Sequence, residues 1–425
     1  MSVSDVAGDS AGDSTGDGAG EGAGTVVVIG AGHAAIQLAA SLRQGRYAGA
    51  ITLIADEAGL PYQRPPLSKA FLSGQMEESA LALRPASFYA AQSVAVIEND
   101  RAIAIDRAAH TVILASGARH GYAHLVLATG AANRPLPVPG AALPGVVGLR
   151  SLAEAKALKA LLPGLRRVVV IGAGFIGLEF AAVAAEHGIT VTVIEAAPRP
   201  LMRGVSAVMS GHLAAAHRGW GSTLLTGIGV KAIHGSTGAE AVETTDGRMI
   251  PADLVLVAIG VIPNMALAAA AGLKTGNGIE VDASFATLDP AISAVGDCAA
   301  FPMAEQPGLV RLESVQNASD QARALADRLL GKATPYAKLP WFWSDQGALK
   351  LQIAGLSGGH DHTVLRGDPA AGAFSVFCFE GDRLLAVESL NRAPDHMAAR
   401  RFLAGAPKIT PAQAADPGFD LRGAG

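Results

Sequence analysis

The sequence predicts an α/β fold in which two dinucleotide-binding units are followed by an α+β C-terminal domain. Three observations predict this fold. An apolar run breaks into glycines and small residues at residues 26–35 (VVVIGAGHAA), and the same pattern returns at residues 168–179 (VVVIGAGFIGLE). Short β-like runs, with two of the three tryptophans, occupy the chain from residue 335 onward. Each glycine pattern is typical of a buried strand that turns tightly into a helix, so both units are expected to be Rossmann-like.

The first glycine pattern predicts a phosphate-binding turn. Gly30 permits the sharp turn, Gly32 lets a pyrophosphate approach the backbone, and Ala34 is one of the small residues that let helix and strand pack closely. The helix that follows directs free N–H groups at the phosphates. One such pattern is weak evidence, but the second repeats the strand, the glycine spacing and the helix, which favours two nucleotide sites over two ordinary turns. Its glycines are Gly172, Gly174 and Gly177.

Composition narrows the possible classes of protein. The 425 residues suffice for two or three domains. Every stretch of about 18 residues is interrupted by charged or helix-breaking residues, so no membrane span is expected. A net charge of −4 gives no general signature of nucleic-acid binding. Cys298 and Cys378 are the two cysteines, too few for a disulfide scaffold, which favours a reducing cytoplasm. Residues 1–24 are rich in Gly, Ala and Asp, lack the features of a signal peptide, and are expected to form a disordered tail.

The second strand of the first unit, expected at residues 51–55 after a helix at residues 36–42, ends at two carboxylates. Asp56 or Glu57 can accept hydrogen bonds from adenosine ribose hydroxyls, and the pattern leaves open which of them does so.

A proline-rich phrase follows at residues 60–72 (LPYQRPPLSKAFL). Its prolines fix an extended path, and Ser68 is expected to cap a short helix that carries Lys69. A rigid loop of this kind would hold Arg64 and Lys69 near two phosphates and a redox ring, and surface ion pairs are the alternative role for both side chains.

The first unit is expected to continue through antiparallel strands and then to return to its sheet. Residues 94–114 alternate like antiparallel strands, and the apolar run at residues 125–130 (LVLATG) stops at a glycine. Arg134 follows among prolines, and Arg150 lies at the expected crossing between domains. Either arginine can reach a phosphate or another cofactor oxygen, and a salt bridge at the domain boundary is the alternative.

The second unit is expected at residues 146–263, and its second strand ends at Glu195. This carboxylate lies close to the expected position about 20 residues after the first glycine. It would accept the 2′-hydroxyl of NAD and repel a 2′-phosphate, which favours NADH over NADPH, although the nearby Arg199 and Arg203 would soften that preference. Hairpin-like strands and an apolar run that ends at Gly260 close the unit.

The chain then returns to the first unit and enters its last domain. Asp297, after a glycine at the end of an apolar strand, can accept a hydrogen bond from a cofactor hydroxyl, and the start of the following helix is expected to face the pyrophosphate. Capping of that helix is the alternative role for Asp297. Further on, Trp341 and Trp343 alternate with Phe342, so one strand face carries both indoles. Core packing is their usual fate; covering the cofactor or guiding a partner is the alternative.

Eight segments taken in order (GAGHAA, LPYQRPPLSK, LVLATG, GAGFIGLE, GVIPN, AVGDCA, ESVQNASDQAR and PWFWSDQ) resemble the FAD-containing, NADH-dependent ferredoxin reductases of bacterial oxygenase systems. The resemblance covers roughly residues 25–420. It implies a glutathione-reductase-like fold, with an FAD-binding domain at residues 25–145 and 264–334, an NAD-binding domain at residues 146–263, and a C-terminal domain at residues 335–425 near the flavin and the partner surface.

The resemblance also implies roles for single residues. Glu179 matches a carboxylate near the nicotinamide, and a buried pair between it and Lys69 would orient both rings; these two are the expected catalytic residues. Ala102 matches a backbone contact to adenine, and Asp297 and Val315 match residues that hold the ribityl chain and the flavin ring. The residues expected to hold FAD are Gly30, Gly32, Ala34, Asp56, Glu57, Arg64, Lys69, Ala102, Arg134, Arg150, Asp297, Val315 and Trp343. Those expected to hold NADH are Gly172, Gly174, Gly177, Glu195, Arg203 and Gly260.

The implied activity is hydride transfer from NADH to tightly bound FAD, followed by two single-electron transfers to a 2Fe-2S ferredoxin that supplies a cytochrome monooxygenase or similar oxygenase. The contact with the ferredoxin is expected to be transient and electrostatic, with basic candidates at Arg311, Lys338, Arg392 and Arg400. A rubredoxin reductase and an apoptosis-inducing-factor-like, NADH-responsive flavoprotein are the alternatives. A disulfide reductase needs a redox cysteine pair after the first strand–helix unit, where this chain has residues 62–69 and no cysteine.

Overall fold

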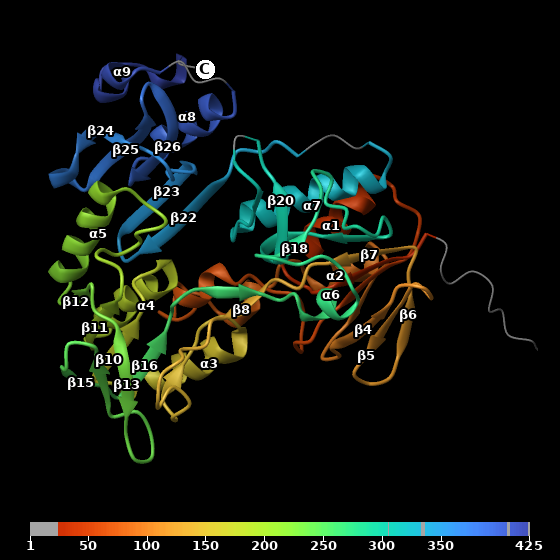
Figure 1. Ribbon diagram of the computed structural model, residues 1–425, viewed down its shortest axis with the longest axis horizontal. Coiled ribbons are helices and arrows are strands. Elements are labelled where there is room, and N and C mark those ends of the chain that lie inside the picture. Colours follow the sequence, from red (N-terminus) through yellow and green to blue (C-terminus); the bar gives the residue numbers. More distant parts are fainter. Residues whose placement is uncertain (1–23, 305, 333–335, 406–408, 424–425) are drawn as a thin grey trace, which may run out of the picture.

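The computed structural model describes residues 24–304, 306–332, 336–405 and 409–423. Two units built on parallel sheets lie beside each other, and the C-terminal residues pack on the second unit (Figure 1). The expected tail at residues 1–24 lies, apart from Gly24, outside the described residues. Among the described helices, none has both the length and the apolar character that crossing a membrane requires.

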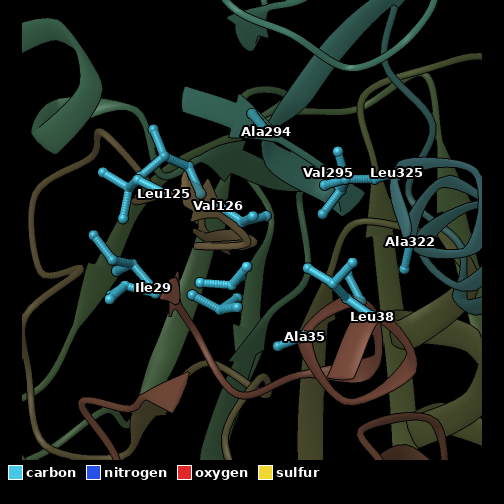
Figure 2. Close-up of a cluster of buried hydrophobic side chains, with 14 of the residues drawn as sticks. Ile29, Ala35, Leu38, Leu125, Val126, Ala294, Val295, Ala322 and Leu325 are labelled. Atoms are coloured by element: carbon cyan, nitrogen blue, oxygen red, sulfur yellow. The ribbon is translucent and has the colours of Figure 1, made fainter. Parts of the chain in front are cut away.

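The first large sheet is parallel, with the strand order β19-β7-β1-β2-β3. Its strands are β1 (Val26–Ile29), β2 (Ile51–Ile54), β3 (Val94–Ile97), β7 (His124–Leu127) and β19 (Ile292–Ala294). Two neighbouring helices, α1 (His33–Gln44) and α7 (Val315–Leu329), pack their apolar side chains against β1, β7 and β19 (Figure 2). This burial explains why the strands are near-continuous apolar runs.

Smaller elements surround this sheet, and three local predictions are wrong. The antiparallel sheet begins only at β4, because β3 joins the parallel sheet beside β2. Ser68 does not cap a helix: it ends the short 3₁₀ helix Pro65–Ser68, since two prolines with fixed φ begin that helix directly after Arg64. Asp297 lies in a 3₁₀ turn that leads into a strand, so no helix follows it directly.

The smaller elements around the first sheet are α2 (Ala86–Ala91), β4 (Ala102–Asp106), β5 (Thr111–Leu114), β6 (Arg119–Gly121), α6 (Ala266–Ala270), β18 (Ile279–Glu280), β20 (Ala299–Pro302) and β21 (Leu309–Val310).

The second large sheet is also parallel, with the order β12-β11-β10-β16-β9. Helix α4 (Phe175–Glu186) is apolar almost all round, because it packs between this sheet and the C-terminal strand β22 (Trp341–Gln346). The remaining elements of the unit are β9 (Val146–Val147), α3 (Leu152–Leu161), β10 (Arg167–Ile171), β11 (Thr190–Glu195), α5 (Ala207–Gly219), β12 (Thr223–Thr226), β13 (Val230–His234), β14 (Ala241–Thr244), β15 (Met249–Pro251) and β16 (Leu254–Val257).

The chain crosses between the two units twice, and the crossings are hydrogen-bonded to each other. The outward crossing β8 (Ala131–Asn133) and the return crossing β17 (Val261–Pro263) form an antiparallel pair. Figure 1 shows β8 between the two parallel sheets. The pair therefore joins the units by a short ribbon rather than by two separate loops.

The C-terminal residues form an antiparallel sheet with the order β22-β23-β26-β25-β24. Side chains of this sheet, such as Leu351 and Phe374, share one hydrophobic cluster with Phe180 and Met209 of the second unit. The sheet and its helices confirm the predicted α+β domain, and the two parallel sheets confirm the predicted α/β class. The further elements are β23 (Leu349–Gly355), β24 (His362–Asp368), β25 (Ala373–Glu380), β26 (Arg383–Leu390), α8 (Ala393–Leu403) and α9 (Pro411–Ala415).

A buried carboxylate lies where the C-terminal sheet meets the second unit. Glu388 is fully buried on β26, and it accepts hydrogen bonds of 2.6 Å from both the backbone N–H and the hydroxyl of Ser206, which caps α5. Burial raises the pKa of Glu388 above its ordinary value. The folded protein therefore holds a proton here that the unfolded chain releases at a lower pH.

This proton makes stability depend on pH in a defined direction. The pKa of Glu388 is raised on folding. Its contribution to the free energy of unfolding is therefore fully present below the pKa of the unfolded chain, and it is lost as pH rises through the pKa of the folded protein. We expect Glu388→Gln to melt at the same temperature as the parent near pH 4 and about 2 °C or more above it near pH 8. The measurement is thermal unfolding from about pH 4 to 8. The exposed Glu380, on the neighbouring strand, supplies the control Glu380→Gln, and equal pH profiles for both variants would contradict the assignment.

Candidate functional site

A cleft of about 2410 Å³ lies between the two units and reaches the first strand of the C-terminal sheet. It is lined by both glycine turns, by residues of the crossing ribbon and by β22. Ligand pockets usually hold roughly 300–1,000 Å³, so this cleft has room for more than one ligand. Of the residues expected to bind cofactors or to act in catalysis, all but Gly177 line it. Gly177 instead packs beneath its own turn, where an added Cβ would lie 2.3 Å from the carbonyl oxygen of Gly172.

The two glycine turns have the same geometry. Gly30 and Gly172 have φ values of +112° and +101°, and an added Cβ would lie 2.2 Å from the carbonyl oxygen of Ala128 and 2.4 Å from that of Ala258. Only glycine fits these positions. At Gly32 an added Cβ would meet nothing within 4 Å, and no side chain caps the helix that begins there. The open backbone at this helix N-terminus fits a pyrophosphate group.

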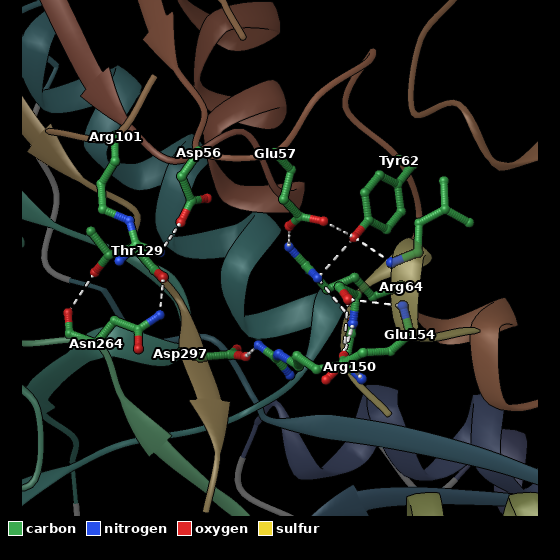
Figure 3. Close-up of polar contacts among 12 residues, drawn as sticks. Asp56, Glu57, Tyr62, Arg64, Arg101, Thr129, Arg150, Glu154, Asn264 and Asp297 are labelled. Carbon is green, nitrogen blue, oxygen red and sulfur yellow. Dashed lines mark hydrogen bonds and ion pairs between the residues drawn. The ribbon is translucent and has the colours of Figure 1, made fainter. Parts of the chain in front are cut away.

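The two acidic residues after β2 diverge, as Figure 3 shows. Asp56 forms an exposed ion pair of 3.1 Å with Arg101. Both carboxylate oxygens of Glu57 are engaged: one accepts from Arg64 at 2.6 Å and the other from the Tyr62 hydroxyl at 2.5 Å. Asp56 is thus the more available of the two carboxylates.

Tyr62 and two arginines connect this end of the cleft to Asp297 (Figure 3). The Tyr62 hydroxyl accepts hydrogen bonds from Arg64 at 3.0 Å and from the backbone N–H of Leu152 at 2.9 Å. Arg64 also donates to the carbonyl oxygen of Arg150 at 2.9 Å, and Arg150 pairs with Asp297 at 2.8 Å. Arg64 and Arg150 therefore form ion pairs and also line the cleft. Tyr62 is not among the residues that the sequence pattern indicates, although its place in the rigid proline loop is a usable signal.

His33 is a second site residue that the sequence pattern does not indicate. It is the first residue of α1 and lines the cleft beside the first glycine turn. Burial lowers the pKa of His33 to about 4; Arg64 and Arg150 add to this effect and Asp297 opposes it. The imidazole is therefore neutral at neutral pH and adds no charge beside the turn.

Lys69 and Glu179 form a buried ion pair that lines the cleft. Their Nζ and Oε1 atoms are 3.0 Å apart, and the side chain of Glu179 is only 4% exposed. Ser68 donates to Oε2 of Glu179 at 2.5 Å, and Ser344 of β22 donates to Oε1 at 2.7 Å. The Glu179 carboxylate, which belongs to the second unit, therefore accepts hydrogen bonds from the first unit and from the C-terminal sheet.

Glu195 is held in place by backbone groups at the end of β11. Its two carboxylate oxygens accept hydrogen bonds from the N–H groups of Ala173, at 2.7 Å, and Ala197, at 2.8 Å. Ala173 belongs to the second glycine turn, so the carboxylate lies directly beside that turn. Arg203 and Gly260 also line the cleft, and a Cβ added at Gly260 would lie 3.9 Å from the Arg203 guanidinium.

The comparisons with known proteins agree with this arrangement. Residues 24–322 match the family described as pyridine nucleotide-disulphide oxidoreductase, and residues 341–424 match the reductase C-terminal family. The chain belongs to the pyridine nucleotide-disulphide oxidoreductases. Members of this family use FAD and NAD(H), and the two turns of the cleft suit two dinucleotides.

Several relatives of this oxidoreductase are similar over nearly their whole length. Rhodocoxin reductase of Rhodococcus erythropolis is 51% identical over 399 residues, which cover 94% of this chain and 93% of the relative. The solved ferredoxin reductase for the CYP199A2 system of Rhodopseudomonas palustris has a TM-score of 0.92 at 50% identity, covering 94% and 99% of the two chains. The reductase in the covalent putidaredoxin reductase–putidaredoxin complex has a TM-score of 0.91 at 39% identity, covering 94% and 98%.

The cysteines of this oxidoreductase do not form a redox pair. Cys298 and Cys378 are both free and buried. Burial raises the pKa of each thiol, which disfavours the reactive thiolate. Cys298 donates to the carbonyl oxygens of Leu127 and Val295, as a small core residue does. Disulfide reductases carry their redox cysteine pair after the first strand–helix unit. This chain has Lys69 in that region.

We expect Gly32→Ala to weaken FAD retention without unfolding the protein. The added methyl group meets no protein atom within 4 Å but occupies the space over the helix N-terminus. The flavin-to-protein absorbance ratio of the purified oxidoreductase should fall, with FAD affinity reduced about tenfold or more, while the melting temperature of the apoprotein stays unchanged.

Gly164→Ala is the matched control, because this glycine also has open space but does not line the cleft. Full FAD content in Gly32→Ala would show that no pyrophosphate approaches this turn.

Proposed function

We propose that this protein is an NADH-dependent ferredoxin reductase that passes electrons from NADH through tightly bound FAD to a 2Fe-2S ferredoxin, which in turn supplies a cytochrome monooxygenase or similar oxygenase. The observation that carries the proposal is the buried Lys69–Glu179 pair in a cleft shared by two glycine turns. The relatives named for rhodocoxin, putidaredoxin and the CYP199A2 system support it. The two free, buried thiols suit a reducing cytoplasm.

Bound FAD supplies the ability to accept a hydride and to release single electrons. The protein contributes alignment and charge. Lys69 places an ammonium group in the cleft, where it can stabilise negative charge, and Glu179 holds that ammonium at 3.0 Å. Glu179 is further proposed to position the nicotinamide carboxamide, so that the two rings meet in a reactive geometry. No side chain acts as a nucleophile in this mechanism.

Glu195 is proposed to select NADH over NADPH. Its carboxylate is fixed by two backbone N–H groups beside the second glycine turn, so it is placed to accept a ribose hydroxyl and to repel a phosphate. The side chain of Arg203, which also lines the cleft, is the group that would reduce the preference for NADH over NADPH.

Two aromatic rings lead from the cleft toward Arg400, one of the basic side chains expected to contact the ferredoxin. Trp343 lines the cleft, its ring centre lies 5.7 Å from that of Trp341, and Arg400 stacks over the Trp341 ring at 4.3 Å. These contacts suit a transient encounter with an acidic ferredoxin. The other basic candidates differ: Lys338 is exposed, whereas the Arg311 side chain is only 9% exposed and pairs with Glu313. Arg392 pairs with Asp395.

An anaerobic titration tests the function. We expect the purified protein to contain FAD that loses its absorption when NADH is added, and then to reduce a 2Fe-2S ferredoxin faster than rubredoxin or a quinone. Preference for rubredoxin would favour a rubredoxin reductase. Slow turnover with every acceptor would favour an NADH-responsive interaction protein, and a protein without FAD would contradict all three interpretations.

Lys69→Met should slow the reduction of the flavin by NADH about tenfold or more, because the ammonium group is lost while the length of the side chain is kept. The measurement is the rate of flavin absorbance loss in anaerobic stopped flow. Lys156→Met is the control, since Lys156 forms only an exposed ion pair with Glu78 on the surface. An unchanged rate in Lys69→Met would remove Lys69 from the mechanism.

A further inference from the structure

A chain of buried polar side chains runs from Glu179 to helix α5. Ser344 donates to Oε1 of Glu179 at 2.7 Å, and the side-chain amide of Gln346 donates to the Ser344 hydroxyl at 3.3 Å. The amide oxygen of Gln346 lies 2.9 Å from Nε2 of His217. Ser344 and His217 are fully buried, and Gln346 is 1% exposed. The chain is thus shielded from water along its whole length.

The direction of this chain is set at His217. Burial lowers the pKa of His217, so its imidazole is neutral and carries one N–H proton. The Nδ1 atom is buried without a hydrogen-bond partner, and an N–H group there would lose its hydrogen bond to water. The proton therefore resides on Nε2, which donates to the amide oxygen of Gln346. Every donor in the chain then points toward Glu179.

Without the His217 proton, the Gln346 amide has no reason to keep this orientation. If the amide turned over, its oxygen would face Ser344 and its NH₂ group would face away. The single hydroxyl proton of Ser344 would then have two competing acceptors, the Gln346 amide oxygen and the Glu179 carboxylate, and its hydrogen bond to Glu179 would weaken. The donors to Glu179 without such a competitor would be Lys69 and Ser68.

We propose that His217, Gln346 and Ser344 are positioning residues that fix the Glu179 carboxylate, and through it the Lys69 ammonium group, for the reaction with NADH. The inference rests on the proposed function of the Lys69–Glu179 pair. It assigns a role to a histidine of helix α5 that is not among the residues lining the cleft. Because Ser344 and Gln346 share β22 and lie two residues apart, both side chains reach the same face of that strand.

The test compares three variants. His217→Phe keeps a ring of similar size and removes the N–H donor, and it should slow flavin reduction by NADH about tenfold, the effect of losing one hydrogen bond to a charged group. The double variant His217→Phe/Gln346→Met removes the competing amide as well, so that Ser344 can again donate only to Glu179. Its rate should return to within about threefold of the parent. His212→Phe on the same helix is the control, because His212 lies against the Phe374 ring and outside the chain.

Equilibrium titration with NAD⁺ by calorimetry gives a readout that does not depend on turnover. Weaker NAD⁺ binding in His217→Phe, restored in the double variant, is the expected result. A purely structural role for His217 would instead make the double variant worse than the single variant in rate, NAD⁺ affinity and melting temperature. This order of the variants would overturn the inference, as would a parent-like rate in His217→Phe.

The parent protein separates this inference from the proposed function. If NADH does not reduce the flavin of the parent, the proposed function fails and the inference fails with it. If the parent is reduced and His217→Phe behaves like the control His212→Phe, the function stands and only the positioning role is overturned.

Discussion

The buried carboxylate of Glu179 is the constraint on which the arrangement of the three domains depends. An ionised group 4% exposed is costly unless it is paired and hydrogen-bonded. Helix α4 brings Glu179 to the junction, but its partners come from elsewhere: Lys69 and Ser68 from the first unit, and Ser344 from the C-terminal sheet. Separation of any domain would leave the charge with fewer partners. The same contacts that satisfy Glu179 therefore hold the cleft in one shape.

A fixed cleft matters because hydride transfer requires the reacting atoms to meet within about 3–3.5 Å. Two features of the chain keep the glycine turns in register with each other. The crossings β8 and β17 pair as a ribbon instead of moving as independent loops. The C-terminal sheet shares a hydrophobic cluster with the second unit, so β22 cannot move without exposing apolar surface. Alignment of two cofactors thus follows from interactions that also stabilise the fold.

The sequence predicts the fold well because its strongest signals are local. Strand, glycine and helix follow one another within a few residues at both turns, and the carboxylates Asp56 and Glu195 lie at or just after the ends of their strands. Ser344, Gln346 and His217 give no such signal, since their roles depend on elements that meet only in the folded protein. The wrong prediction for Ser68 has the same origin. Its hydroxyl suits a helix cap locally. In the folded protein, however, it donates a hydrogen bond of 2.5 Å to the buried carboxylate of Glu179, and a hydrogen bond to a charged group is stronger than one between neutral groups.

The position after the first strand–helix unit shows how one fold serves different redox chemistry. A cysteine pair there would exchange electrons in pairs through a covalent bond. This chain has Lys69 at that position, and its two thiols are buried with raised pKa values. An ammonium group can stabilise charge but cannot store electrons, so electrons leaving the flavin need another carrier. Trp343 and Trp341 extend from the cleft toward Arg400, and these contacts support the proposed exit on the C-terminal domain rather than on the loop that carries Lys69.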